Sequence, residues 1–143
     1  MNSKMNFTKL FQNLLIALLI LTTSSELFSQ DKKSTDLTDF KVVIEITDNG
    51  IKLISEKGCA WKELTFSIID KKQQAIDEYG MVELDKNHSK KTDGLADFLF
   101  TLTKTKNEIE LKGIKGTAWT NLSFSLLKNQ KQAVDQFGIT DLK

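Results

Sequence analysis

The stretch Gly58-Cys59-Ala60-Trp61-Lys62-Glu63-Leu64-Thr65-Phe66-Ser67 occurs twice in this chain. The second copy lies 58 positions later, as Gly116-Thr117-Ala118-Trp119-Thr120-Asn121-Leu122-Ser123-Phe124-Ser125. The match extends further, because 11 of the 27 positions in 58–84 are identical to those in 116–142. Self-similarity at a fixed spacing is typical of a duplicated structural unit. The sequence therefore predicts two copies of one small fold.

The residues before each copy alternate between apolar and polar. Phe40, Val42, Ile44 and Ile46 are apolar with mostly polar residues between them, which is the period of a half-buried strand. Asp48-Asn49-Gly50 follows and is a strong hairpin signal, because these residues tolerate positive φ. The same pattern restarts in the second half of the chain, at Phe98, Phe100, Leu102, Ile109 and Leu111.

We expect an all-β protein made of two tandem repeats of about 45 residues, each with four strands. A four-stranded unit this small buries its apolar face poorly, so the two repeats should pack as a pseudo-symmetric sandwich or small barrel. Two separate small sheets are the alternative. The expected boundaries are 40–84 for repeat 1, 85–97 for a linker and 98–143 for repeat 2. Within repeat 1, residues 74–81 favour an irregular fourth strand, with a short helix as the alternative.

The N-terminus has the layout of a secretory signal peptide, which we place at 1–29. Positive residues come first, the apolar run 14–21 follows, and small and polar residues come after it. The run is shorter than the roughly 20 residues that a membrane span needs, so cleavage is favoured over an uncleaved anchor. Cleavage is expected after Ser25 or Ser29, with Ser29 favoured. Residues 30–39 are polar and are expected to form a flexible mature N-terminus. The sequence thus predicts export to the periplasm or the extracellular space, without an integral membrane span after cleavage.

The charged residues argue against a nucleic-acid partner. The chain has 20 positive and 19 negative side chains, and removal of 1–29 takes Lys4, Lys9 and Glu26, which leaves no net charge. Every positive side chain is a lysine. Nucleic-acid-binding domains usually carry a basic excess and use arginine for bidentate contacts. The mixed charges are instead typical of a solvated surface.

Trp61 and Trp119 are the main candidates for a ligand-contact surface, because aromatic side chains give large contact areas. Each lies at the same place in its copy, just before a strand, and this favours packing in the core over ligand contact. Gly58 and Gly116 are expected at structural turns, where φ is positive or the backbone approaches closely.

Four other residues could carry chemistry. Cys59 is the single cysteine, and Thr117 replaces it in the second copy, so a packing role is expected, with an intermolecular disulfide as the functional alternative. Asp77 and Asp135 could form a carboxylate pair of the kind that glycosidases use, but capping of local turns is favoured. The single histidine, His88, lies in the polar linker outside any metal-ligand spacing. We therefore predict no catalytic site, no metal site and no cofactor.

These features favour a secreted, non-enzymatic β module that binds a protein or a component of the cell envelope. The alternative is a protein that binds a small molecule or carbohydrate in an inter-repeat cleft lined by Trp61 and Trp119. An enzyme is the third hypothesis, with Asp77 and Asp135 as its only candidate centre.

Overall fold

The computed structural model describes residues 37–69, 71–86 and 91–143. All of them belong to one compact unit, Lys33–Lys143, and they form β-strands without a helix. The all-β prediction is therefore confirmed for this part of the chain. The predicted signal peptide, most of the predicted N-terminal tail and His88 lie outside the described residues. No helix within those residues has the length and apolar character needed to cross a membrane.

The described strands are, in chain order, β1 (Lys41–Thr47), β2 (Gly50–Lys57), β3 (Glu63–Phe66), β4 (Gln73–Asp77), β5 (Gly80–Val82), β6 (Leu99–Lys104), β7 (Glu108–Lys115), β8 (Asn121–Ser125), β9 (Lys131–Asp135) and β10 (Gly138–Thr140).

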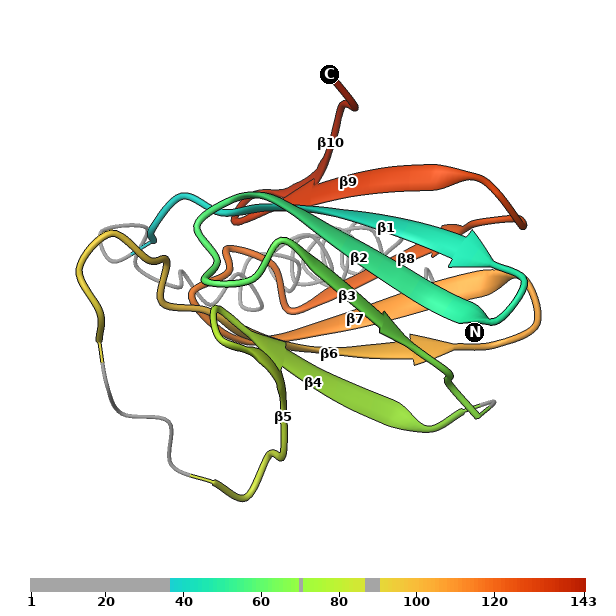
Figure 1. Cartoon of the computed structure of the whole chain (residues 1–143), viewed down its shortest axis with the longest axis horizontal. Helices are drawn as coiled ribbons and strands as arrows, with labels where there is room; N and C mark the ends of the chain where they lie inside the picture. The colour runs from blue at the N-terminus through green and yellow to red at the C-terminus, as the bar shows by residue number, and fades with distance from the viewer. Residues whose placement is uncertain (1–36, 70, 87–90) are drawn as a thin grey trace, which may run out of the picture. The chain divides into compact units, whose positions relative to one another are not determined.

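These strands form two five-stranded antiparallel sheets. The first sheet has the order β10-β9-β1-β2-β3, and the second has the order β5-β4-β6-β7-β8. Figure 1 shows that β9 lies beside β1, and that β4 lies beside β6, although each pair is far apart in the sequence. Each half of the chain therefore gives three strands to one sheet and a hairpin to the other.

The number of strands differs from the prediction. Residues 40–84 and 98–143 each give five strands rather than four, and neither stretch forms a sheet of its own. The difference arises at 74–81, where the chain forms the hairpin β4–β5 instead of one irregular strand or a short helix. The carboxylate oxygen Oδ1 of Asp77 accepts the N–H groups of Tyr79 at 2.8 Å and Gly80 at 3.0 Å. Gly80 has a φ of 131°, which glycine adopts without strain, so the chain reverses here.

The core lies between the two sheets. The alternation Phe40, Val42, Ile44 and Ile46 is confirmed, since all four side chains are buried. The ring of Phe40 stacks on that of Phe98 with centroids 4.2 Å apart, which joins the first sheet to the second. Because side chains in protein cores are closely packed, these contacts fix how the two sheets face each other. The other buried core residues from both sheets are Ile51, Leu53, Trp61, Ile76, Ala96, Phe98, Phe100, Leu102, Ile109, Leu111, Trp119, Leu126 and Val134.

Some residues that were assigned to the tail and the linker also contact the sheets. The N–H of Asp97 donates to Thr38 Oγ1 at 2.8 Å. The N–H of Ala96 donates to the carbonyl of Gly58 at 2.8 Å, and Ala96 is buried in the core. These bonds link the segment before β1, the loop after β2 and the segment before β6.

Candidate functional site

The two tryptophans connect the sheets. Trp61 lies in the loop before β3, in the first sheet, and its Nε1 donates to the carbonyl of Asp77 on β4, in the second sheet, at 3.0 Å. Trp119 lies before β8 and donates to the carbonyl of Asp135 on β9 at 2.9 Å. The two residues are only 8% and 7% exposed. Their rings are therefore core anchors that offer little surface to a ligand in this structure.

A main-chain hydrogen bond reinforces each of these connections. The N–H of Ala60 donates to the carbonyl of Glu78, and the N–H of Ala118 donates to the carbonyl of Gln136, both at 2.8 Å. The Gly-x-Ala-Trp stretch thus attaches a loop of one sheet to the hairpin turn of the other.

Gly58 and Gly116 permit this close approach. Their φ angles are 85° and 69°, in a region that L side chains rarely adopt. A Cβ atom on Gly58 would lie 2.5 Å from the carbonyl oxygen of Asp39, and one on Gly116 would lie 2.0 Å from that of Asp97. Both positions therefore require glycine for two separate reasons, backbone angle and space.

Cys59 is poorly suited to act as a nucleophile. It is half-buried, and burial raises the pKa of its thiol to about 11, with Glu78 and Asp77 adding to the rise. The thiol is therefore protonated near neutral pH, whereas the thiolate is the reactive form. At the matching position, Thr117 donates from Oγ1 to the carbonyl of Trp119 at 2.8 Å. An intermolecular disulfide at Cys59 stays a prediction.

Asp77 and Asp135 belong to different sheets, and each closes its own hairpin. Oδ1 of Asp135 accepts the N–H groups of Phe137 at 2.7 Å and Gly138 at 3.1 Å, as Asp77 does in the turn between β4 and β5. A carboxylate that accepts two backbone N–H groups is held in place by the turn. Within the described residues, no group of three or more histidine, cysteine or acidic side chains could hold a metal ion.

No motif or spacing in the sequence marks Glu78, which lines a pocket of about 190 Å³ beside the β4–β5 turn. Glu78 is 6% exposed, and its Oε2 accepts the N–H of Phe98 at 3.4 Å. Burial raises its pKa above the ordinary value, and the charges of Asp77 and Asp97 raise it further. The residues that line the pocket are Asp77, Glu78, Leu84, Lys86, Asp97, Phe98, Leu99 and Lys115.

Gln136 occupies the position in the β9–β10 turn that Glu78 occupies in the β4–β5 turn. Its Oε1 accepts the N–H of Phe40 at 3.2 Å, and its Nε2 donates to Oδ1 of Asp39 at 2.9 Å. Asp39 also forms an ion pair with Lys57 at 2.8 Å. One turn is therefore held by an amide and the other by a buried carboxyl group.

Exposed apolar side chains lie on and beside the edge strands β5 and β10, and the sequence does not predict this exposure. Each has a strand partner on one side only within the described sheets. The large apolar residues on these strands and beside them are 42% to 67% exposed, and they are Tyr79, Met81, Leu84, Phe137, Ile139 and Leu142. These residues do form a pattern in the sequence, since the three near β5 lie 58 positions before the three near β10. The pattern does not predict exposure, because edge strands cannot be recognised until the order of strands in the sheet is known.

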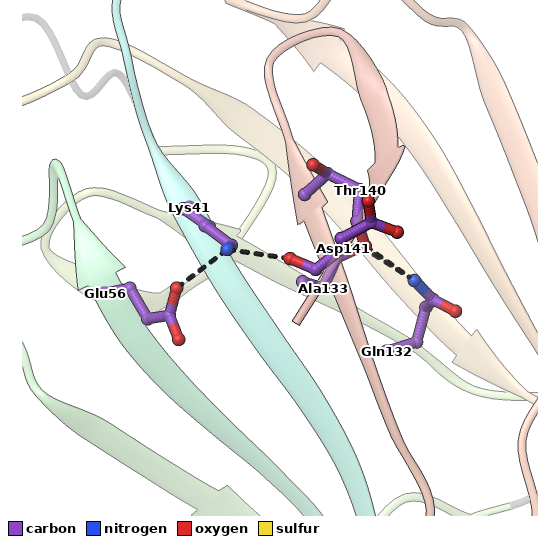
Figure 2. Close-up of polar contacts among 6 residues, drawn as sticks. All are labelled: Lys41, Glu56, Gln132, Ala133, Thr140 and Asp141. Carbon is purple, nitrogen blue, oxygen red and sulfur yellow. Dashed lines mark hydrogen bonds and ion pairs between the residues drawn. The ribbon is translucent and has the colours of Figure 1, made fainter. Parts of the chain in front are cut away.

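Polar contacts hold β10 and the residue after it against the rest of the first sheet (Figure 2). Lys41 on β1 donates from Nζ to the carbonyl of Asp141 at 2.8 Å and forms an ion pair with Glu56 at 3.0 Å. Gln132 on β9 donates from Nε2 to the carbonyl of Thr140 at 3.0 Å. In the other sheet, Gln74 makes the equivalent bond to the carbonyl of Val82 at 3.4 Å. The C-terminal edge strand is thus fixed by two side chains, and none of the described strands pairs with its outer edge.

A scan against protein-family models found no match to this chain, and searches of curated proteins and of solved structures found none either.

Proposed function

We propose that the chain is an exported, non-enzymatic β module that binds an extended segment of a partner protein along its edge strands. The observation that carries the proposal is that six of the nine exposed large apolar side chains of the described residues lie on β5 and β10 or within two residues of them. An edge strand presents main-chain N–H and C=O groups to an incoming strand, and apolar side chains beside it supply contact area. Soluble proteins rarely leave such surfaces uncovered.

The arrangement favours binding over catalysis. Burial keeps the thiol of Cys59 protonated near neutral pH, and Asp77 and Asp135 are engaged in turns on separate sheets. The alternative of a carbohydrate site lined by tryptophans is less favoured, because both indole N–H groups already bond to backbone carbonyls. Export remains part of the proposal and rests on the layout of residues 1–29.

We also infer that the two halves of the chain are tandem repeats packed as a pseudo-symmetric sandwich, each giving its C-terminal hairpin to the other's sheet. The hydrogen bonds of Trp61 and Trp119 support this, because the two donor residues lie 58 positions apart and so do the two acceptor residues. Lys71 and Asn129 support it too, since both are non-glycine residues with positive φ, at 68° and 65°, and they have the same spacing. Two copies of one unit would give the module two related binding edges.

The edge-strand proposal can be tested with selected peptides. A displayed library of random peptides would be selected on the purified protein, and the binding site of each selected peptide would be mapped by amide chemical-shift changes. We expect changes centred on 137–142 or 79–84, and weaker binding by Ile139→Lys or Met81→Lys. Thr65→Lys, which places the same charge on an exposed position of β3, is the matched control.

Peptides that bind elsewhere, or with equal affinity to the edge-strand variants, would count against the proposal. Titration of the same protein with oligosaccharides tests the alternative. A change in tryptophan fluorescence that saturates, and that Trp61→Phe or Trp119→Phe abolishes, would favour the carbohydrate site. Mass spectrometry of the exported chain tests cleavage, with Gln30 or Glu26 expected as the first residue.

A further inference from the structure

The two hairpin turns that start β5 and β10 are held by nearly the same contacts, with one chemical difference. Glu78 and Gln136 each accept a main-chain N–H, from Phe98 and Phe40 respectively. Gln136 can also donate, and its Nε2 bonds to Asp39. An ionised carboxyl group has no proton to donate.

Asp97 lies 58 positions after Asp39, the same spacing that separates Gln136 from Glu78. Both aspartates form an ion pair with a lysine, since Asp97 pairs with Lys115 at 2.7 Å and Asp39 pairs with Lys57 at 2.8 Å. Glu78 and Asp97 line the same pocket. A favourable pair of amide and carboxylate in one half is thus replaced by two carboxyl groups in the other.

We propose that Glu78 and Asp97 form an acid-sensitive lock on the β4–β5 hairpin, while Gln136 and Asp39 hold the β9–β10 hairpin independently of pH. When Glu78 carries a proton, it can donate a hydrogen bond toward Asp97, as Gln136 does toward Asp39. When Glu78 is ionised, the two carboxylates repel each other in a buried setting. The hairpin that carries β5 is then less firmly held.

Most of the groups around Glu78 favour its protonated form. Burial disfavours a negative charge on Glu78, and the charges of Asp77 on β4 and Asp97 before β6 disfavour it further. Lys115 on β7 and Lys86 after β5 also line the pocket, and the main-chain N–H groups of Glu78 and Phe98 act the other way. The thiol of Cys59, whose pKa is raised by burial and by Glu78 and Asp77, is neutral at neutral pH. The pKa of Glu78 is raised despite these opposing groups.

The sign of the pH effect follows from linkage. A carboxyl group whose pKa is higher in the folded state binds its proton more tightly there than in the unfolded chain. The folded hairpin therefore gains stability as the pH falls, and it loses this stability as the pH rises through the raised pKa of Glu78. This behaviour concerns the hairpin itself and does not depend on the proposed binding function.

The test is hydrogen exchange on the purified protein at pH 5 and pH 8, corrected for intrinsic exchange rates. We expect the protection of amides in β5, relative to those in β10, to be higher at pH 5 than at pH 8. The isosteric change Glu78→Gln should raise the relative protection at pH 8 and remove its pH dependence. Asp97→Asn should reduce the dependence.

The reciprocal variant gives a second test. Gln136→Glu should make β10 pH-sensitive while leaving the response of β5 unchanged. The proposal is wrong if the relative protection of β5 in the unmodified protein does not change with pH, or if Glu78→Gln keeps the same dependence. Glu78→Gln adds no volume and imitates a residue already present at the other turn. It therefore decides the question even if Gln136→Glu fails to fold.

Discussion

The indole N–H of Trp61 donates to the main-chain carbonyl of Asp77 across the two sheets, at 3.0 Å. The same bond joins Trp119 to Asp135 at 2.9 Å. Because the donor is in a loop of one sheet and the acceptor is in a hairpin of the other, each bond resists separation of the sheets. The stretch that is duplicated in the sequence is thus an inter-sheet anchor.

Replacing either tryptophan by phenylalanine should destabilise the fold. Trp61→Phe and Trp119→Phe each lose one buried hydrogen bond and part of a large ring, so we expect a loss of about 1–3 kcal/mol in the free energy of unfolding. Urea unfolding measures this loss, with Phe137→Leu on the exposed edge as a control that should cost little. Acrylamide should quench the native fluorescence weakly and the urea-unfolded fluorescence strongly. Strong quenching of the native protein would contradict the burial of both rings.

Alanine at Gly58 or Gly116 should be costly. The added Cβ would meet a carbonyl oxygen at 2.5 Å or 2.0 Å, and the positive φ adds strain of about 1–2 kcal/mol for a non-glycine residue. We expect each variant to lose about 2–4 kcal/mol in urea unfolding. Gly94→Ala is a close control, because Gly94 has a φ of 84° with no atom within 4 Å of the new Cβ. Equal losses at Gly58 and Gly94 would show that space plays no part.

Cys59 should react slowly with thiol reagents in the folded protein. Its pKa is raised to about 11, chiefly by burial, so little thiolate is present at pH 7–8. Alkylation by iodoacetamide, followed by mass spectrometry, should be much slower in the native protein than in urea. The protonated thiol is favoured by folding, so its contribution to stability is present below about pH 9 and is lost as the pH rises toward 11.

Cys59→Thr provides the control for that titration. Thr117 stands at the matching position, so this variant should fold, and its stability above pH 9 should fall less steeply. Rapid alkylation of the native protein at pH 7 would contradict the assignment of a buried, protonated thiol.

Removing the amine of Lys41 should loosen β10 more than it destabilises the protein. Lys41→Met keeps the aliphatic stem but loses the bond to the carbonyl of Asp141 and the ion pair with Glu56. We expect faster amide exchange in β10 and a loss of at most about 1 kcal/mol in global stability. Lys52→Met breaks the ion pair with Glu63 in the same sheet, away from β10, and should leave exchange in β10 unchanged. Equal effects from both variants would mean that Lys41 does not hold β10.

Local patterns predicted the parts of the fold that depend on neighbouring residues. The alternation from Phe40 to Ile46 identified a strand and its buried face, because side chains on a strand alternate between two faces. Asp48-Asn49-Gly50 predicted a hairpin, and β1 and β2 do meet there, with Thr47 opposite Gly50. The signal at 74–81 was weaker, because two strands of five and three residues are too short to show a clear period.

The sequence predicts less of the candidate site than of the fold. The repeated position of Trp61 and Trp119 favours a core role, and both side chains are buried in the core. Glu78 was not recognised, since its chemistry comes from Asp97 and the N–H of Phe98, which lie about twenty residues away in the sequence. The exposed apolar residues of β5 and β10 resembled core residues, because an apolar side chain on an edge strand has the same pattern as one on a central strand.

The sequence by itself thus determined the all-β class of the described residues and the duplicated pattern, because strand faces and hairpin turns are set locally. Only the tertiary structure decided that the β4–β5 hairpin pairs with β6 and the β9–β10 hairpin with β1. Strand pairing joins residues that are far apart in the chain, and any antiparallel edge with matching apolar residues satisfies the local pattern equally well. The duplicated Gly-x-Ala-Trp stretch shows both levels. The positive φ of its glycine is a local feature, whereas the nearby carbonyl oxygen that leaves no room for a Cβ there and the partner of its tryptophan both come from tertiary packing.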